Sequence, residues 1–140
     1  MRQYTILCYF FAAIALIKGA SDLIQGLASQ RAFGATLTDA GFADPMVDNV
    51  FRFFSGLWFG VGVMFILFVR DLDRYKPAMI ALLGMVILGG LGRLLSIWQY
   101  GLPDHSMGVT LIFLGLLAEV IMSPVMLWWL TSRHRSSGYP

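Results

Sequence analysis

The chain has 140 residues, of which 58% are hydrophobic and 13% are charged. The charged share is about half of the roughly 25% usual in soluble domains, which excludes a soluble globular domain and a disordered chain. The net charge of +2 is too small for a surface that binds DNA or RNA, so no nucleic-acid partner is expected. The composition predicts a membrane protein.

Four long apolar runs dominate the sequence. A helix of about 20 residues crosses the roughly 30 Å hydrocarbon core of a bilayer. The runs therefore predict an all-α integral membrane protein, a bundle of four transmembrane helices that forms a single domain over residues 1–140. The expected spans are 5–27, 50–69, 77–98 and 109–130.

Two connections show where helices begin. Asp44 is a good N-cap residue and Pro45 follows it, so the second helix should begin near Met46, before its apolar run. The charged segment 70–76 predicts a tight turn, after which Pro77 would occupy the first helical position.

Proline and glycine also mark the second half of the chain. Gly101 and Pro103 are expected to end the third helix. Pro124 lies inside the fourth run, where it should bend the helix and free a backbone carbonyl near Val120.

The distribution of Lys and Arg predicts the orientation in the membrane, since cytoplasmic loops are rich in both. One side has six basic residues, whereas the other has Arg31, Arg52 at a helix edge, and four acidic residues. We expect both termini and the 70–76 turn in the cytoplasm, with loops 28–49 and 99–108 outside. The six basic residues are Arg2, Arg70, Arg74, Lys76, Arg133 and Arg135, and the acidic residues are Asp39, Asp44, Asp48 and Asp104.

The first run has a rival interpretation as a cleaved signal peptide, because Arg2 precedes an apolar stretch. Lys18 and Asp22 interrupt the region of small residues in which cleavage would fall. A retained transmembrane span is therefore the favoured interpretation.

The sequence predicts no cofactor. A single cysteine, Cys8, excludes an intrachain disulfide and a paired-thiol redox site. His105 and His134 both lie outside the apolar runs, whereas a haem inside a helix bundle needs histidines that project into the core. The chain also has no nucleotide-binding or hydrolase motif.

Five ionisable residues lie within or at the edges of the apolar runs. Such residues are costly in lipid and should face protein or water. Helix rise places all five in the outer half of the bilayer, with Glu119 deepest at about 15 Å, near the midplane. The inner half of the bundle carries no charge. The five residues are Lys18, Asp22, Arg52, Arg93 and Glu119.

Helical spacing groups these residues with other polar side chains. Lys18 and Asp22 are four residues apart and able to pair, and Ser96 follows Arg93 by three. Every helix thus has a polar stripe, and the similar depths suggest one shared ligand site formed by Arg93, Glu119, Arg52, Lys18, Asp22 and Ser96.

A structural interpretation competes with this ligand site. Arg93 with Glu119, and Lys18 with Asp22, would then be ion pairs that only hold the bundle together. Arg52 lies near the interface and could reach lipid phosphate, which is the simpler explanation for that residue. The depth of Arg93 and Glu119 favours a functional role for those two.

Small residues at helical spacing predict close contacts between helices. Gly56 and Gly60 form a GxxxG motif with Gly62 beyond it, and Ala15 and Gly19 form a small-xxx-small pair. Tight packing within one chain is favoured over a homodimer face, because GxxxG is a weak signal in a glycine-rich chain.

Several segments form an ordered set: Arg52-Phe-Phe-Ser-Gly56 with Gly60-Val-Gly62, Gly89-Gly-Leu-Gly-Arg93-Leu-Leu-Ser96, Gly101-Leu-Pro103, and Glu119 with Pro124. This set resembles a family of small bacterial four-helix membrane proteins catalogued as domain of unknown function 4345, over nearly the whole chain. The family is similar, more distantly, to the DoxX-like membrane proteins, some of which are linked to quinone-dependent sulfur oxidation, and in size to the small sterol-pathway scaffold proteins of eukaryotes. The resemblance implies four spans in a bacterial inner membrane and singles out Arg52, Arg93, Ser96 and Glu119, but it implies no reaction.

The leading hypothesis is a non-catalytic membrane protein, surrounded by membrane lipids, that binds a lipid- or quinone-like molecule or a partner helix. Arg93 would contact an anionic or carbonyl oxygen, Glu119 would hold Arg93 or donate a proton, and Lys18 with Asp22 would close the opposite wall. One alternative is a proton-coupled transporter that works as a homodimer, with Glu119 as the coupling carboxylate and Pro124 as a hinge. Another is a membrane-embedded enzyme with Glu119 as general acid and Arg93 as electrostatic stabiliser.

Overall fold

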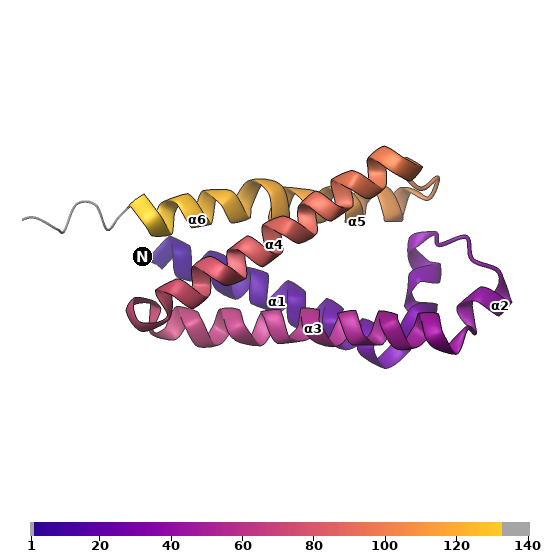
Figure 1. Cartoon of the computed structure of the whole chain (residues 1–140), viewed down its shortest axis with the longest axis horizontal. Helices are drawn as coiled ribbons and strands as arrows, with labels where there is room; N and C mark the ends of the chain where they lie inside the picture. Colours follow the sequence, from indigo (N-terminus) through magenta and orange to yellow (C-terminus); the bar gives the residue numbers. More distant parts are fainter. Residues whose placement is uncertain (1, 133–140) are drawn as a thin grey trace, which may run out of the picture.

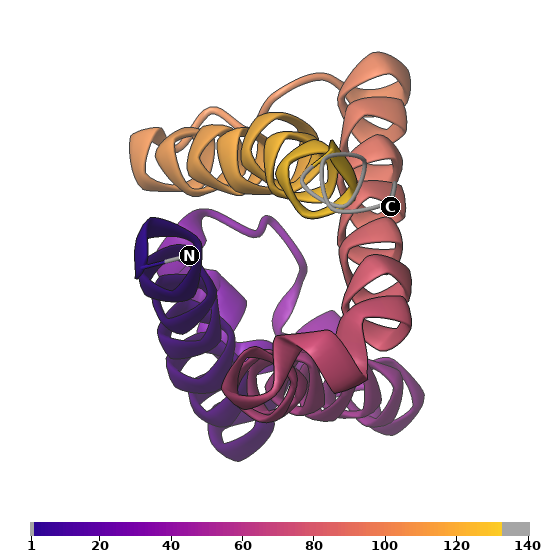
Figure 2. The same cartoon turned by 90° about the vertical axis from the view of Figure 1, so that its left-hand side faces the viewer.

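The regular structure of the chain is entirely helical over residues 2–132, which the computed structural model describes. Within that range, four helical segments are long and apolar enough to cross a membrane, and Figure 2 shows the bundle along its long axis. The prediction of an all-α protein with four spans is confirmed, and the chain is a multi-pass membrane protein. The four segments are Arg2–Phe33, Pro45–Arg70, Leu72–Tyr100 and Ser106–Ser132.

The first span consists of α1 (Arg2–Gln25) and a 3-10 helix, η1 (Gly26–Phe33). Gly26, with φ +66°, separates the two, a backbone conformation that glycine adopts without strain. A short helix, α2 (Asp39–Phe42), follows η1. The expected 28–49 loop therefore contains two helical elements that the search for apolar periodicity missed, because short polar helices lack such a pattern.

The second span, α3 (Pro45–Arg70), begins as predicted. The Asp44 carboxylate accepts hydrogen bonds from the backbone N–H groups of Met46 and Val47, at 2.8 and 3.0 Å. This satisfies two of the N–H groups that have no partner within a helix.

The third span, α4 (Leu72–Tyr100), begins earlier than the sequence predicted. Only Asp71 separates it from α3, and the Asp71 carboxylate accepts from the backbone N–H of Arg74 at 3.3 Å. The prediction of a turn over 70–76 with Pro77 as the first helical residue is wrong, since Pro77 lies inside the helix. The N-cap favours the earlier start. The carbonyl that Pro77 leaves unpaired belongs to Asp73, an exposed residue in the first turn of the helix.

The fourth span has three parts: α5 (Ser106–Leu116), a π-helical segment η2 (Leu117–Met122) and α6 (Ser123–Ser132). The Ser123 backbone N–H and hydroxyl both donate to the Ala118 carbonyl, five residues back. The widened turn immediately precedes Pro124, in the region where the sequence predicted a disturbed helix. Gly101, with φ +78°, ends α4 as expected. Arg133, His134 and Arg135 lie outside the described residues.

The hydrophobic core lies at one end of the bundle. In Figure 1 this is the end that holds the N-terminus, the α3–α4 connection and the end of α6, whereas α4 and α5 diverge from α1 and α3 at the other end. Tertiary packing is therefore dense in one half of the molecule and open in the other. The core residues are Tyr4, Cys8, Phe11, Ala12, Val61, Phe65, Val69, Met79, Leu82, Leu83, Val86, Met126 and Leu130.

Glycine allows α1 and α3 to pack closely. A Cβ added at Gly62 would lie 2.8 Å from Leu16 Cγ and 3.0 Å from the Ala12 carbonyl oxygen, and one added at Gly19 would lie 2.7 Å from the Phe59 backbone nitrogen. Apart from the neighbouring backbone of α3 itself, no described atom lies within 4 Å of a Cβ added at Gly60. Close packing within the chain thus depends on Gly19 and Gly62 rather than on the GxxxG motif.

Candidate functional site

The open half of the bundle contains a cleft with two adjoining chambers, each of about 270 Å³. The apolar chamber lies nearer the core, and the polar chamber lies nearer η1. Both are lined by Lys18, Trp58, Arg93 and Leu111, so they lie side by side between α1, α3, α4 and α5. The apolar chamber adds Phe11, Ile14, Leu114, Gly115, Ala118 and Glu119, and the polar chamber adds Asp22, Gln30, Phe51, Phe54 and Ser55.

Arg93 and Glu119 form an ion pair between α4 and η2. Arg93 Nε donates to Glu119 Oε2 at 2.8 Å, with 6% of the Glu119 side chain and 44% of the Arg93 side chain exposed. Gly90 and Gly115 make room for the pair, since an added Cβ would lie 2.8 Å from Glu119 Cβ and 3.3 Å from Arg93 Nε, respectively. The two Nη atoms of Arg93 have no hydrogen-bond acceptor within residues 2–132.

Lys18 and Asp22 form the second pair, on α1, as their spacing predicted. Lys18 Nζ donates to the Asp22 carboxylate and lies 4.9 Å from the centroid of the Phe33 ring. Ser29, in η1, also donates to Asp22, at 2.9 Å, and Gln30 donates to Ser29 at 3.0 Å. These bonds hold η1 over the polar chamber.

The cleft opens sideways, toward the bilayer. Ile14 of α1 and Leu114 of α5 line the apolar chamber, yet 44% and 60% of these residues are exposed. An edge-to-face contact between Tyr4 and Trp129 joins α1 to α6 at the core end, with ring centroids 6.1 Å apart. The opening is thus bounded at that end and leads between α1 and α5 into the apolar chamber.

η1 bounds the cleft at its other end. A Cβ added at Gly108 of α5 would lie 2.3 Å from the Phe33 carbonyl oxygen, so η1 and α5 are in backbone contact there. The arrangement provides an apolar space with a charged, hydrogen-bonding end, which suits an amphiphilic small molecule.

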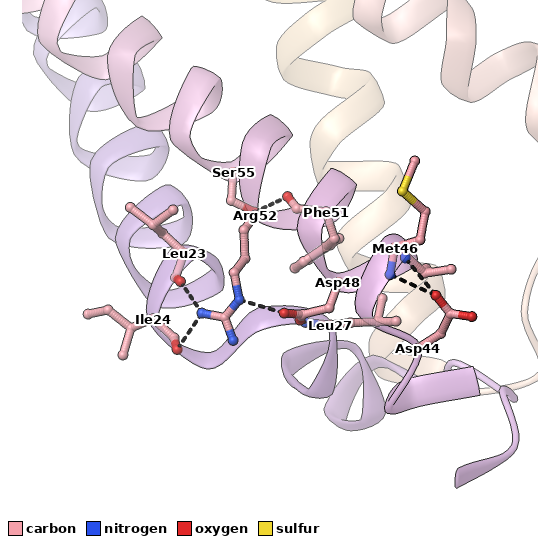
Figure 3. Close-up of polar contacts among 10 residues, drawn as sticks. Leu23, Ile24, Leu27, Asp44, Met46, Asp48, Phe51, Arg52 and Ser55 are labelled. Carbon is pink, nitrogen blue, oxygen red and sulfur yellow. Dashed lines mark hydrogen bonds and ion pairs between the residues drawn. The ribbon is translucent and has the colours of Figure 1, made fainter. Parts of the chain in front are cut away.

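Arg52 lies outside the cleft and joins the ends of α1 and α3 (Figure 3). Its Nε donates to Asp48 at 2.7 Å, and its Nη1 donates to the Leu23 and Ile24 carbonyls at 2.6 and 3.0 Å. Asp48 in turn accepts from the Leu27 backbone N–H at 2.7 Å. Arg52 thereby supplies donors to the last carbonyls of α1, where a positive charge also interacts favourably with the helix dipole.

The structure brings together four of the six predicted site residues: Lys18, Asp22, Arg93 and Glu119. Ser96 is exposed and lines neither chamber, so it lies outside the cleft, as Arg52 does.

Sequence reasoning missed several residues of the cleft. Trp58 lies at helical spacing from Ser55 and could have been placed on the same face of α3. Gln30 lines the polar chamber, and Ser29 bonds to Asp22 of that chamber, only because η1 folds over it. No sequence signal marked that return.

Residues 4–130 match the family model described as a domain of unknown function (DUF4345). No match was found among curated proteins or among solved structures. The more distant similarity to DoxX-like proteins stays a prediction.

Proposed function

This chain belongs to the family of the domain of unknown function DUF4345, and we propose that it binds a lipid- or quinone-like molecule inside the membrane. The supporting observation is an apolar cleft with a lateral opening and a guanidinium at its polar end. The Nη atoms of Arg93 offer hydrogen bonds that no acceptor in the described residues takes up. Unpaired donors at membrane depth are costly, and a ligand oxygen would satisfy them.

The different chemistry of the two chambers supports one orientation of the ligand. The apolar chamber would hold hydrocarbon or a ring against Phe11, Trp58 and Leu111, and the polar chamber would hold the headgroup. A tail longer than the cleft would leave through the lateral opening between Ile14 and Leu114. This role requires binding and orientation only, without a covalent step.

The first test blocks the opening. We expect native mass spectrometry of the purified wild type to show one small molecule per chain, identified after lipid extraction. Leu114→Trp should reduce its occupancy at least about tenfold, because indole occupies the opening that Leu114 now lines.

Phe113→Trp is the matched control for this test. Phe113 is the neighbouring residue, similarly exposed, and lines the α4–α5 groove instead of the cleft. Phe113→Trp should therefore leave the occupancy of the small molecule unchanged. A wild-type protein that carries no small molecule, or equal loss in both variants, would overturn the proposal.

We further propose that the protein lies in a bacterial inner membrane with both termini in the cytoplasm and η1 outside. The support is the uneven distribution of Lys and Arg between the two ends of the bundle. Three of these basic residues, Arg70, Arg74 and Lys76, lie around the α3–α4 connection, on the side opposite η1. Thr36 and Asp73 are exposed residues on opposite ends of the bundle.

Thiol labelling of intact cells tests this orientation. A membrane-impermeant maleimide should label Thr36→Cys before lysis and Asp73→Cys only after lysis, while the buried Cys8 stays unlabelled in both cases. The reverse pattern would invert the proposed orientation.

A further inference from the structure

The cleft has no net formal charge. Its two cations, Lys18 and Arg93, are each paired with a carboxylate, Asp22 and Glu119, so the four charges sum to zero. Arg52, which the sequence predicted as a fifth charge of the site, is paired with Asp48 outside it. Without Arg52, no surplus positive charge remains in the cleft.

Most polar groups of the cleft are already paired. Asp22 accepts from both Lys18 and Ser29, and the Ser55 hydroxyl donates to the Phe51 carbonyl at 2.8 Å. The Nη donors of Arg93 remain without an acceptor in the described part of the chain. A bound molecule would therefore have to supply a hydrogen-bond acceptor, but it would not have to supply a negative charge.

We infer that the ligand has an uncharged headgroup with acceptor oxygens, such as an ester or quinone carbonyl. This inference rests on the proposed function. An anionic phosphate would bring a third negative charge against two cations in a region of low dielectric, where uncompensated charge is costly. A carbonyl oxygen accepts from Arg93 and leaves the balance of charge unchanged.

The test offers three probes to the delipidated protein in native mass spectrometry. They are dioleoylglycerol, an isoprenoid quinone and dioleoylphosphatidylglycerol, at equal concentrations. We expect a neutral probe to be retained at least about tenfold over phosphatidylglycerol, and the two neutral probes distinguish the two sources of a carbonyl. Preference for phosphatidylglycerol would overturn this inference but not the proposed function, whereas retention of no probe would overturn the proposed function.

A change of one charge provides the sharper comparison. Glu119→Gln keeps an oxygen that can accept from Arg93 Nε but leaves the cleft with a charge of +1. It should shift the preference at least about tenfold toward phosphatidylglycerol, because an anion then restores neutrality.

The matched control is Asp39→Asn, which makes the same change in net charge at the exposed Arg31–Asp39 pair and should not alter the preference. If Glu119→Gln does not fold, Asp22→Asn makes the same change of charge in the polar chamber. An unaltered preference in a folded variant would overturn the inference.

Discussion

Arg93→Met is expected to lower the free energy of unfolding by about 3 kcal/mol, near the lower end of the range for a broken buried ion pair. Methionine fills much of the volume of the arginine stem but leaves the buried Glu119 carboxylate without its partner. Reversible unfolding in mixed detergent–lipid micelles measures the change. Arg74→Met, which removes an exposed arginine near the start of the same helix, should change the free energy by less than about 0.5 kcal/mol.

The double variant Arg93→Met/Glu119→Leu separates pairing from packing. Replacement of a buried pair by apolar residues of similar volume is often neutral or stabilising, so most of the lost stability should return. A double variant as unstable as Arg93→Met would show that packing around Arg93, and not the unpaired carboxylate, caused the loss.

Gly62→Ala should destabilise the bundle by about 2 kcal/mol, because the new methyl group would press against α1. Two of the three nearest atoms belong to backbone, the Ala12 carbonyl oxygen and the Leu16 nitrogen, so a side-chain rotation cannot relieve the contact and α1 must move away from α3. The same unfolding measurement in mixed micelles applies.

Gly60→Ala is the control, two residues away on the same helix. Apart from the neighbouring backbone of α3 itself, no atom of the described residues lies within 4 Å of its added Cβ, and alanine has a helix propensity about 1 kcal/mol better than glycine in water. We expect Gly60→Ala to be neutral or slightly stabilising in the monomer. Destabilisation by Gly60→Ala equal to that by Gly62→Ala would contradict the assignment of the α1–α3 contact to Gly62.

Local patterns were sufficient for the spans and for one ion pair. Apolar runs long enough to cross a bilayer identify transmembrane helices, because lipid accepts only segments whose backbone groups are internally paired. The start of α3 at Pro45 follows from Asp44, and the Lys18–Asp22 pair follows from a spacing of four residues. These features depend on residues within one or two turns of each other.

The start of α4 shows where a local rule selects the wrong position. Pro77 suits the first helical position, but Asp71 is an N-cap six residues earlier, and the helix accommodates the proline because only one carbonyl is left unpaired. Two valid local signals competed, and the sequence contained no measure of which was stronger.

The amino-acid sequence by itself determined that this protein is a four-span helical membrane protein. Only the tertiary structure decided how charges on different helices meet. Arg52 pairs with Asp48 and binds the end of α1, whereas Arg93 reaches Glu119, 26 residues away, across an interface that Gly90 and Gly115 keep open. The physical reason is that hydropathy and helical periodicity describe one helix at a time. The pairing of charges between helices and the shape of the cleft depend instead on how separate helices diverge and on how η1 folds over the polar chamber.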